Sequence, residues 1–255
     1  MDIGGSSCDA GRTAVWWKIC NFLSVISLRS RSGGRGRRFE GRSEGLYVYC
    51  IIRSPEDRRS FGNIGFDGGE AYTLNYNDFA PVVSSSKMKE YGVDEEDISV
   101  HKTVVEHVME EHSVLPVAYG MVFKNNKLLG VAMKTGHRAM KKAMDSVDGK
   151  VELGVKVLLP QNSTDFNGKI EECRSEIMRC LGEIAADSRS LKLFSDRLLL
   201  NTSFLVDSDR IDEFSDCVGR LAGDYDTLKI QYSGPWPPYN FVDIQILGKK
   251  RGGFR

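Results

Sequence analysis

The sequence predicts an α+β protein of two domains, and three observations lead to this fold class. The chain has 255 residues, which is enough for one large or two ordinary domains. Charge-poor runs of β-branched and aromatic residues alternate with helical patterns in both halves of the chain. The turn sequence SVDGK (146–150) separates these halves. We therefore expect an N-terminal domain over 45–148 and a C-terminal domain over 149–247.

The N-terminal half reads as β-β-β-α-β-α. Its clearest element is the helix over 94–112, in which Ile98, His101 and Val105 recur on one stripe and Asp94 is a good N-cap. The expected elements are, in order, strands over 45–52, 71–76 and 79–85, the helix over 94–112, a strand over 114–123 and a helix over 125–147 that is broken near Gly136. This order predicts an α+β (ferredoxin-like) sandwich with its helices on one face of a sheet.

The C-terminal half reads as β-α-β-α-β, close to a ferredoxin-like fold. Val and Leu alternate with Glu and Lys over 150–160, so we expect this strand to bury one face only. A helix over 166–187 and a strand over 197–206 follow. Asp207 is expected to cap a second helix, and a strand over 227–234 ends the domain.

Both ends of the chain are basic, whereas the middle is net acidic. Residues 1–44 carry eight Lys and Arg against four Asp and Glu, and 248–255 add four more cations. We interpret 1–44 as a disordered basic extension and 248–255 as a basic tail. The acidic middle disfavours a nucleic-acid footprint on the folded body. The only apolar candidate for a membrane segment, 13–28, is short and interrupted by Lys18, so no membrane insertion is expected.

The sequence offers no convincing metal or catalytic motif. His107 and His112 are five residues apart, which places them about 140° apart on a helix and therefore on different faces. His101 lies on the apolar stripe and is expected to pack or hydrogen-bond in the core. The six cysteines show no CxxC spacing, and Cys173 and Cys180 are expected to pack on an apolar helix face. We therefore expect no metal, no cofactor and no enzymatic activity.

The segment YSGPWPPYNFVDI (232–244) carries the candidate binding residues. It holds three of the chain's 7 prolines within four residues, and these remove three backbone donors. We therefore expect no strand ladder or helix to run through them. Three aromatic side chains lie between and after the prolines, and aromatic rings are costly to leave in water. The candidate set, termed the elbow, is Pro235, Trp236, Pro237, Pro238, Tyr239 and Phe241.

Three roles for the elbow follow from its composition. The first role is a proline-rich ligand for an SH3-like partner, the second is a clamp on its own domain, and the third is a docking surface. A proline-rich ligand normally lies in a disordered linker, whereas here a strand leads directly into the prolines. This favours a rigid aromatic turn at a strand end, in which Trp236 and Tyr239 are either buried against the C-terminal domain or exposed as docking anchors.

Several separated stretches together resemble the gas vesicle protein F/L family. They are LYVYCII, HKTVVEHVMEEHSVLPVAYGMVF, GKVELGVKV, NTSFLVDSDRIDEF and LKIQYSGPWPPYNFVDI. The resemblance spans about 46–247, and GPWPPYNF is its most specific element. One departure is Ala118, where the family often has an arginine.

The resemblance implies a cytoplasmic, non-enzymatic accessory or minor structural protein of gas vesicle formation. Its implied partners are the hydrophobic major shell protein and other gas vesicle accessory proteins. Two alternatives remain open. One is an RNA-binding module on a ferredoxin-like scaffold, although the K/R-G-F/Y-G/A-F-V-x-F/Y strand of such modules is missing. The other is a small-molecule enzyme on a dimeric ferredoxin-like scaffold.

Overall fold

The computed structural model describes residues 44–89, 91–160 and 170–244. The basic extension and the basic tail expected at the two ends of the chain lie outside these residues, except for Glu44. Residue contacts divide the described chain into two compact units. The first unit contains 44–148 together with 237–244, and the second contains 149–236. The chain therefore enters the second unit at Gly149 and leaves it after Trp236.

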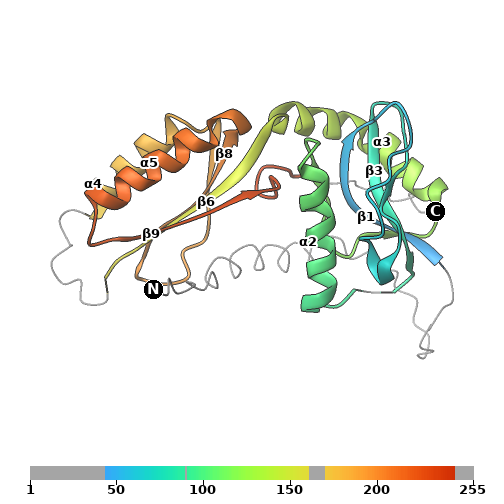
Figure 1. Ribbon diagram of the computed structural model, residues 1–255, viewed down its shortest axis with the longest axis horizontal. Helices are drawn as coiled ribbons and strands as arrows, with labels where there is room; N and C mark the ends of the chain where they lie inside the picture. The colour runs from blue at the N-terminus through green and yellow to red at the C-terminus, as the bar shows by residue number, and fades with distance from the viewer. Residues whose placement is uncertain (1–43, 90, 161–169, 245–255) are drawn as a thin grey trace, which may run out of the picture. The chain divides into compact units, whose positions relative to one another are not determined.

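The first unit is built on a five-stranded antiparallel sheet (Figure 1). The central strands β1 (Glu44–Arg53) and β3 (Phe79–Lys87) pair along their whole length. The other strands are short: β2 (Tyr72–Thr73) pairs with β3, while β4 (Leu115–Pro116) and β5 (Val122–Phe123) both pair with β1. The remaining elements are the short 3-10 helix η1 (Phe66–Gly68) and the α-helices α2 (Glu95–Met109) and α3 (Asn126–Val147).

The two α-helices cover opposite faces of this sheet. The register shift between β1 and β3 falls between Val48 and Cys50 of β1, while β3 advances one residue at a time, so Phe79 and Ser84, five residues apart, point to opposite faces. Ser84 shares a 2.7 Å hydrogen bond with Tyr49, whose ring lies 5.8 Å from that of His101 on α2. The Phe79 ring lies 5.5 Å from that of His137 on α3. The prediction that both helices lie on one face is therefore wrong for this unit.

The burial of β1 explains this difference. Its residues from Tyr47 to Ile52 are all buried, and β3 is buried from Phe79 to Ser84. A strand that is buried on both faces lacks the alternation of apolar and polar residues that marks a one-sided sheet. The uninterrupted run YVYCII was the sequence signal for burial on both faces.

The second unit is an antiparallel four-stranded sheet with the order β7-β8-β6-β9. Two helices lie together on one of its faces (Figure 1). The elements are, in order, β6 (Lys150–Leu158), α4 (Ile170–Gly182), β7 (Asp187–Ser190), β8 (Leu198–Asp207), the 3-10 helix η2 (Ser208–Arg210), α5 (Ile211–Asp224) and β9 (Lys229–Trp236). The core joins Leu153 of β6 with Ile177 of α4 and Phe214 of α5. The apolar face predicted for 150–160 is confirmed, since Val151, Leu153, Val155 and Val157 are buried in this core, but the strand does not bury one face only, because Glu152 on the other face is also buried.

Several predicted elements differ from the observed ones. The strand expected over 114–123 is divided into β4 and β5, because Gly120 between them adopts a φ of 84° and donates its N–H to the Tyr47 hydroxyl at 2.8 Å. Helix α3 continues through Gly136, since buried side chains on both sides of this glycine anchor it to the core. Strand β7 was not predicted, because its sequence DSRS has little strand propensity and depends on pairing with β8.

The two remaining differences lie at the ends of strands. The Asp207 side chain makes no cap hydrogen bond and forms instead an ion pair with Lys150 at 3.4 Å. Strand β9 continues through Pro235 to Trp236, although we expected the prolines to exclude a ladder. Proline is tolerated here because β9 is at the edge of the sheet and its register with β6 shifts between Glu152 and Gly154.

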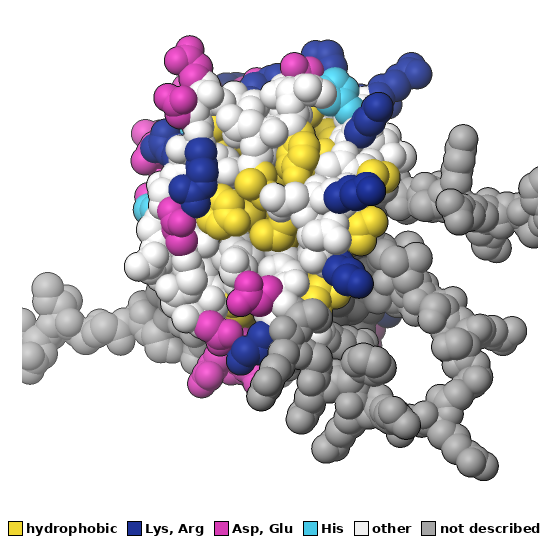
Figure 2. All heavy atoms as spheres, turned by 90° about the vertical axis from the view of Figure 1, so that its right-hand side faces the viewer, with side chains coloured by type: hydrophobic (Ala, Val, Ile, Leu, Met, Phe, Trp, Pro, Cys, Tyr) yellow, Lys and Arg dark blue, Asp and Glu magenta, His cyan; other side chains and the backbone are white. Residues whose placement is uncertain are grey.

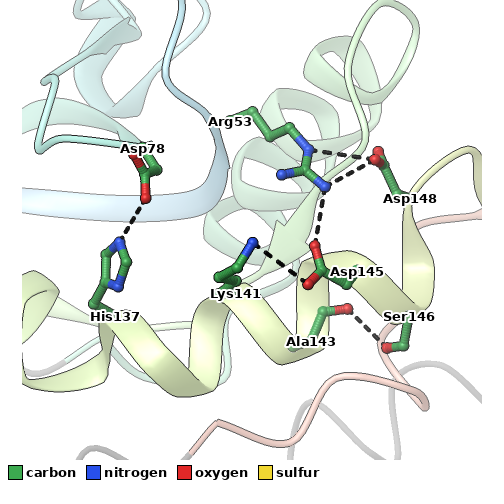
Figure 3. Close-up of polar contacts among 8 residues, drawn as sticks. All are labelled: Arg53, Asp78, His137, Lys141, Ala143, Asp145, Ser146 and Asp148. Carbon is green, nitrogen blue, oxygen red and sulfur yellow. Dashed lines mark hydrogen bonds and ion pairs between the residues drawn. The ribbon is translucent and has the colours of Figure 1, made fainter.

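An arginine at the end of β1 holds the last turn of α3 (Figure 3). The Arg53 guanidinium donates to Asp148 at 2.9 and 3.3 Å and to Asp145 at 3.2 Å. Lys141 also pairs with Asp145 at 3.7 Å. Acidic residues at a helix C-terminus oppose the helix dipole, so the cations compensate an unfavourable arrangement just before the chain enters the second unit.

We expect Arg53→Ala to destabilise the protein by about 1 kcal/mol. The guanidinium is half-exposed, so its ion pairs are screened by solvent, but its loss also leaves two acids uncompensated at the end of α3. The free energy of unfolding in urea measures this change. Lys141→Ala is the matched control and should change stability by less than about 0.5 kcal/mol. Equal effects of the two variants would contradict this role of Arg53.

Candidate functional site

The first part of the elbow is the end of strand β9. Glu152 of β6 is the strand partner of Trp236, and the indole Nε1 donates to the Ser233 hydroxyl at 3.3 Å. Between them, Gly234 has a φ of 126°. A Cβ at this position would lie 2.9 Å from the carbonyl oxygen of Glu152 and 2.9 Å from Leu153 Cδ2. Only glycine fits this close approach, so Gly234 sets the position of the residues that follow.

The second part of the elbow is a pair of tight turns. The Tyr239 N–H donates to the carbonyl oxygen of Pro237 at 2.7 Å, and the Phe241 N–H donates to that of Pro238 at 3.0 Å. These bonds pair the carbonyl oxygens of Pro237 and Pro238. The prolines themselves have no N–H group to contribute to such bonds. The main chain of the elbow is therefore fixed by its own sequence.

The six candidate residues differ in exposure. Pro235 is exposed, Trp236 and Tyr239 are half-buried, and the other three are buried, with Phe241 at 8%. Residue contacts group the first two with the second unit and the last four with the first unit. The side chains open to a partner are thus those of Pro235, Trp236 and Tyr239. Whether the elbow binds a partner stays a prediction.

Strand β9 itself offers a second surface. Among the described residues it pairs only with β6, so one of its edges has no strand partner in that part of the chain. Lys229 is exposed and Ile230–Gly234 are half-buried. An edge strand presents N–H and C=O groups in a row, which is a template for adding a strand from another chain. The site therefore combines a strand edge with partly exposed aromatic side chains.

The histidines and cysteines singled out in the sequence have different surroundings. His101 is 1% exposed, and the prediction that it packs within the core is confirmed. His107 pairs with Glu110 at 3.2 Å on its own helix. Cys173 is buried and Cys180 is half-buried, both with free thiols, which confirms that the first of them packs in the core. In the residues that the structure describes, no group of three His, Cys, Asp or Glu side chains could hold a metal ion.

An aromatic cluster surrounds His101 in the first unit and was not predicted from the sequence. Tyr47 is its centre, with its ring 4.5–6.4 Å from five other aromatic rings, namely those of Tyr49, Phe66, Tyr91, His101 and Tyr119. The tyrosine hydroxyls have partners: Tyr91 bonds Ser86 at 2.6 Å, and Tyr119 donates to the carbonyl oxygen of Gly92 at 3.0 Å. The spacing of the two tyrosines in LYVYCII was the available signal, because it places both on one strand.

His101 is held neutral in this cluster. The Tyr47 hydroxyl accepts the Gly120 N–H and lies 2.9 Å from His101 Nδ1, so it can donate its own proton to that nitrogen. This leaves the proton of the neutral imidazole on Nε2, which faces the Val117 carbonyl without full hydrogen-bond geometry. Burial lowers the pKa of His101 to about 4. The histidine is therefore a structural group that tolerates no charge at neutral pH.

None of the helices in the described part of the chain is long and apolar enough to cross a membrane.

Comparisons with known proteins give a consistent result. The family model "Gas vesicle synthesis protein GvpL/GvpF" matches residues 45–179 and 161–243. Gas vesicle protein F1 of Halobacterium salinarum is 35% identical over 217 residues, which cover 84% of this chain and 100% of that protein. Gas vesicle protein F of Haloferax mediterranei is 36% identical over 216 residues, covering 83% and 99%. The crystal structure of the gas vesicle protein GvpF from Anabaena sp. has a TM-score of 0.71 at 19% identity, covering 80% of this chain and 100% of that one.

Proposed function

The chain belongs to the gas vesicle synthesis protein GvpL/GvpF family and so has a role in gas vesicle formation, and from this premise we propose that it acts by binding shell subunits. In this proposal it is a non-enzymatic accessory protein that works in the cytoplasm and at the gas vesicle. Its partners are the hydrophobic major shell protein and other accessory proteins of the vesicle. It needs no cofactor for this role.

The observation that carries the proposal is the combination of strand edge and elbow on β9. Hydrophobic shell subunits aggregate in water unless they are escorted or inserted in order. A partner for them needs apolar or strand-edge surface on a rigid soluble body. Strand β9 supplies an edge, and Pro235 and Trp236 supply partly exposed apolar surface at its end.

The rigidity of the elbow supports the same role. Two turn hydrogen bonds and three prolines fix its main chain before any partner arrives. A surface that is already ordered loses less conformational entropy on binding, so more of the contact energy appears as affinity. Buried Pro237, Pro238 and Phe241 then act as the support, and the half-buried rings make the contact.

We infer in addition that the second unit is a ferredoxin-like domain. Its order β6-α4-β7-β8-α5-β9 and its antiparallel sheet support this inference. The domains proposed from the sequence are 45–148 and 149–247, whereas residue contacts end the second unit at Trp236, within the elbow. Ferredoxin-like sheets also bind RNA, but on the sheet face opposite the helices β6 and β8 carry Glu152, Asn201 and Ser203, which are buried, rather than exposed aromatic rings.

Co-purification tests the proposal. The full chain, tagged at one end, is co-expressed with the major shell protein of the same organism. We expect the tag to retain the shell protein and to keep it in the soluble fraction, since an occupied apolar surface no longer aggregates. Tagged chain that folds normally but neither retains nor solubilises the shell protein would exclude direct binding of shell subunits.

A further inference from the structure

Exposed apolar side chains of the first unit occur in two places. The large hydrophobic side chains that are exposed in the described residues are Val93 at 58%, Leu128 at 49%, Val131 at 57%, Leu193 at 46% and Phe194 at 66%. The first three belong to the first unit, where Val93 precedes α2 and the other two lie on α3. Figure 2 shows apolar side chains open to solvent on one face of the molecule, with Lys and Arg side chains along one flank.

The exposed apolar residues of α3 lie among cations. Leu128 and Val131 are three residues apart and lie on the same face as Lys127, Lys134 and Arg138, within an arc of about 120°. These five residues are all exposed, and we call them the α3 patch. In the described part of the chain its three cations form no ion pair, unlike Arg53, Arg58, Arg59, Lys87, Lys89, Lys102 and Lys141 of the same unit.

The charge of the α3 patch is unfavourable for the helix itself. Lys127 lies in the first turn of α3, which contains no acidic residue. A cation at a helix N-terminus opposes the helix dipole, and unpaired cations on one face repel each other. The arrangement becomes favourable when an acidic group approaches this face.

A matching acidic patch occurs at the start of α2. Val93 precedes the N-cap Asp94, and Glu95 and Glu96 follow in the first turn. Both glutamates are exposed and form no ion pair among the described residues. We call Val93, Glu95 and Glu96 the α2 patch. Each patch thus has an exposed apolar centre, and the two carry opposite charge.

The two patches lie at opposite ends of β3 and cannot meet within one chain. At the Phe79 end, the Tyr76 hydroxyl donates to the carbonyl oxygen of Asn126 at 3.2 Å, which fixes the start of α3 there. At the Lys87 end, Lys89 pairs with Asp97 in the first turn of α2 at 3.3 Å. Nine residues of strand span about 30 Å, which is too far for side chains to bridge.

We propose that the α3 patch of one copy binds the α2 patch of a second copy. Leu128 and Val131 then pack against Val93, while the cations of α3 meet Glu95 and Glu96. Because the two patches are different surfaces, the contact is heterologous, and each copy keeps one free patch for another neighbour. The protein therefore assembles head to tail, with an affinity that falls as salt screens the charges. This proposal does not depend on the binding of shell subunits.

A charge-exchange experiment on the full chain tests the pairing by sedimentation velocity. The α3 variant is K127E/K134E/R138E, and the α2 variant is E95K/E96K. We expect the unchanged protein to form larger species as its concentration rises at about 0.05 M salt and to lose them at about 0.5 M. Each variant alone should be monomeric, because like charges then face each other. An equimolar mixture of the two should associate again, since each acidic patch finds a basic one.

Control variants separate charge pairing from damage to the fold. R174E/R189E/R220E changes three cations of the second unit and should associate as the unchanged protein does. E95Q/E96Q should weaken association several-fold even if the lysine variant is poorly folded, which circular dichroism reports. An unchanged protein that stays monomeric at every concentration overturns the proposal. A mixture of folded variants that fails to associate also overturns it. The opposite charges of the two patches would then not bring two copies together, and the patches would serve another partner.

Discussion

Trp236→Ala is expected to abolish capture of the major shell protein while the chain stays folded. The indole is half-buried at the end of an edge strand, so its removal should cost less than the roughly 3–5 kcal/mol typical of a fully buried Trp. An aromatic anchor of an interface commonly contributes about 2 kcal/mol or more, which corresponds to a loss of about 30-fold in affinity. Co-purification with the shell protein and vesicle formation in cells that lack their own copy measure the loss.

Phe194→Ala is the matched control for this prediction. Phe194 is an aromatic residue of the same unit with 66% exposure, and its ring lies 5.7 Å from the ammonium of Lys156, whose partner on β9 is Gln231 rather than Trp236. Its removal should leave both assays unchanged. Two results would contradict the role of Trp236. One is unfolding of the variant by circular dichroism, which would make the indole a core residue. The other is a folded variant that still retains the shell protein and supports vesicles.

The second large effect is a loss of stability at acidic pH caused by His101. Its pKa is about 4 in the folded protein against an ordinary value of 6.5, so the unfolded chain binds the proton more readily. The contribution of His101 is therefore fully present above pH 6.5 and is lost as the pH falls towards 4. A difference of this size corresponds to about 3 kcal/mol of unfolding free energy. Urea unfolding at a series of pH values between about 7 and 4 measures this change.

His101→Gln isolates this effect from other titrating groups. Burial also lowers the pKa of His112, which contributes in the same direction. The glutamine variant keeps a neutral polar group in the cluster near Tyr47 and should lose the larger part of the pH dependence between 6.5 and 4. We expect it to be less stable at neutral pH, because Gln fills the aromatic cluster imperfectly. Identical pH profiles of the two proteins would mean that His101 accepts a proton without unfolding.

The sequence predicted the elements that form by local pattern and missed those that depend on pairing. Helix α2 begins after Asp94 as expected, because the cap and the apolar stripe are both local signals. The four residues of β7 have no such signal, and only β8 makes them a strand. The opposite placement of α2 and α3 was missed because the period of a helix does not tell which face of a sheet it covers.

The elbow shows the same division. Its composition identified a rigid aromatic segment at a strand end, and the turns at Tyr239 and Phe241 agree with that interpretation. Exposure was not predictable, since Pro237 and Pro238 are buried whereas Pro235 is exposed within the same short run. Proline restricts the backbone at each position equally, but tertiary contacts decide which ring meets solvent.

The pairing of Glu152 with Trp236 has a consequence for how the chain is completed during synthesis. The second unit is one continuous segment, 149–236, that begins and ends on neighbouring strands. The first unit is interrupted, since residues 237–244, with buried Pro237, Pro238 and Phe241, come after the second. Nascent domains usually finish folding from the N-terminus onwards. Here the order of completion is inverted: the unit that leaves the ribosome first is the last to receive all of its parts.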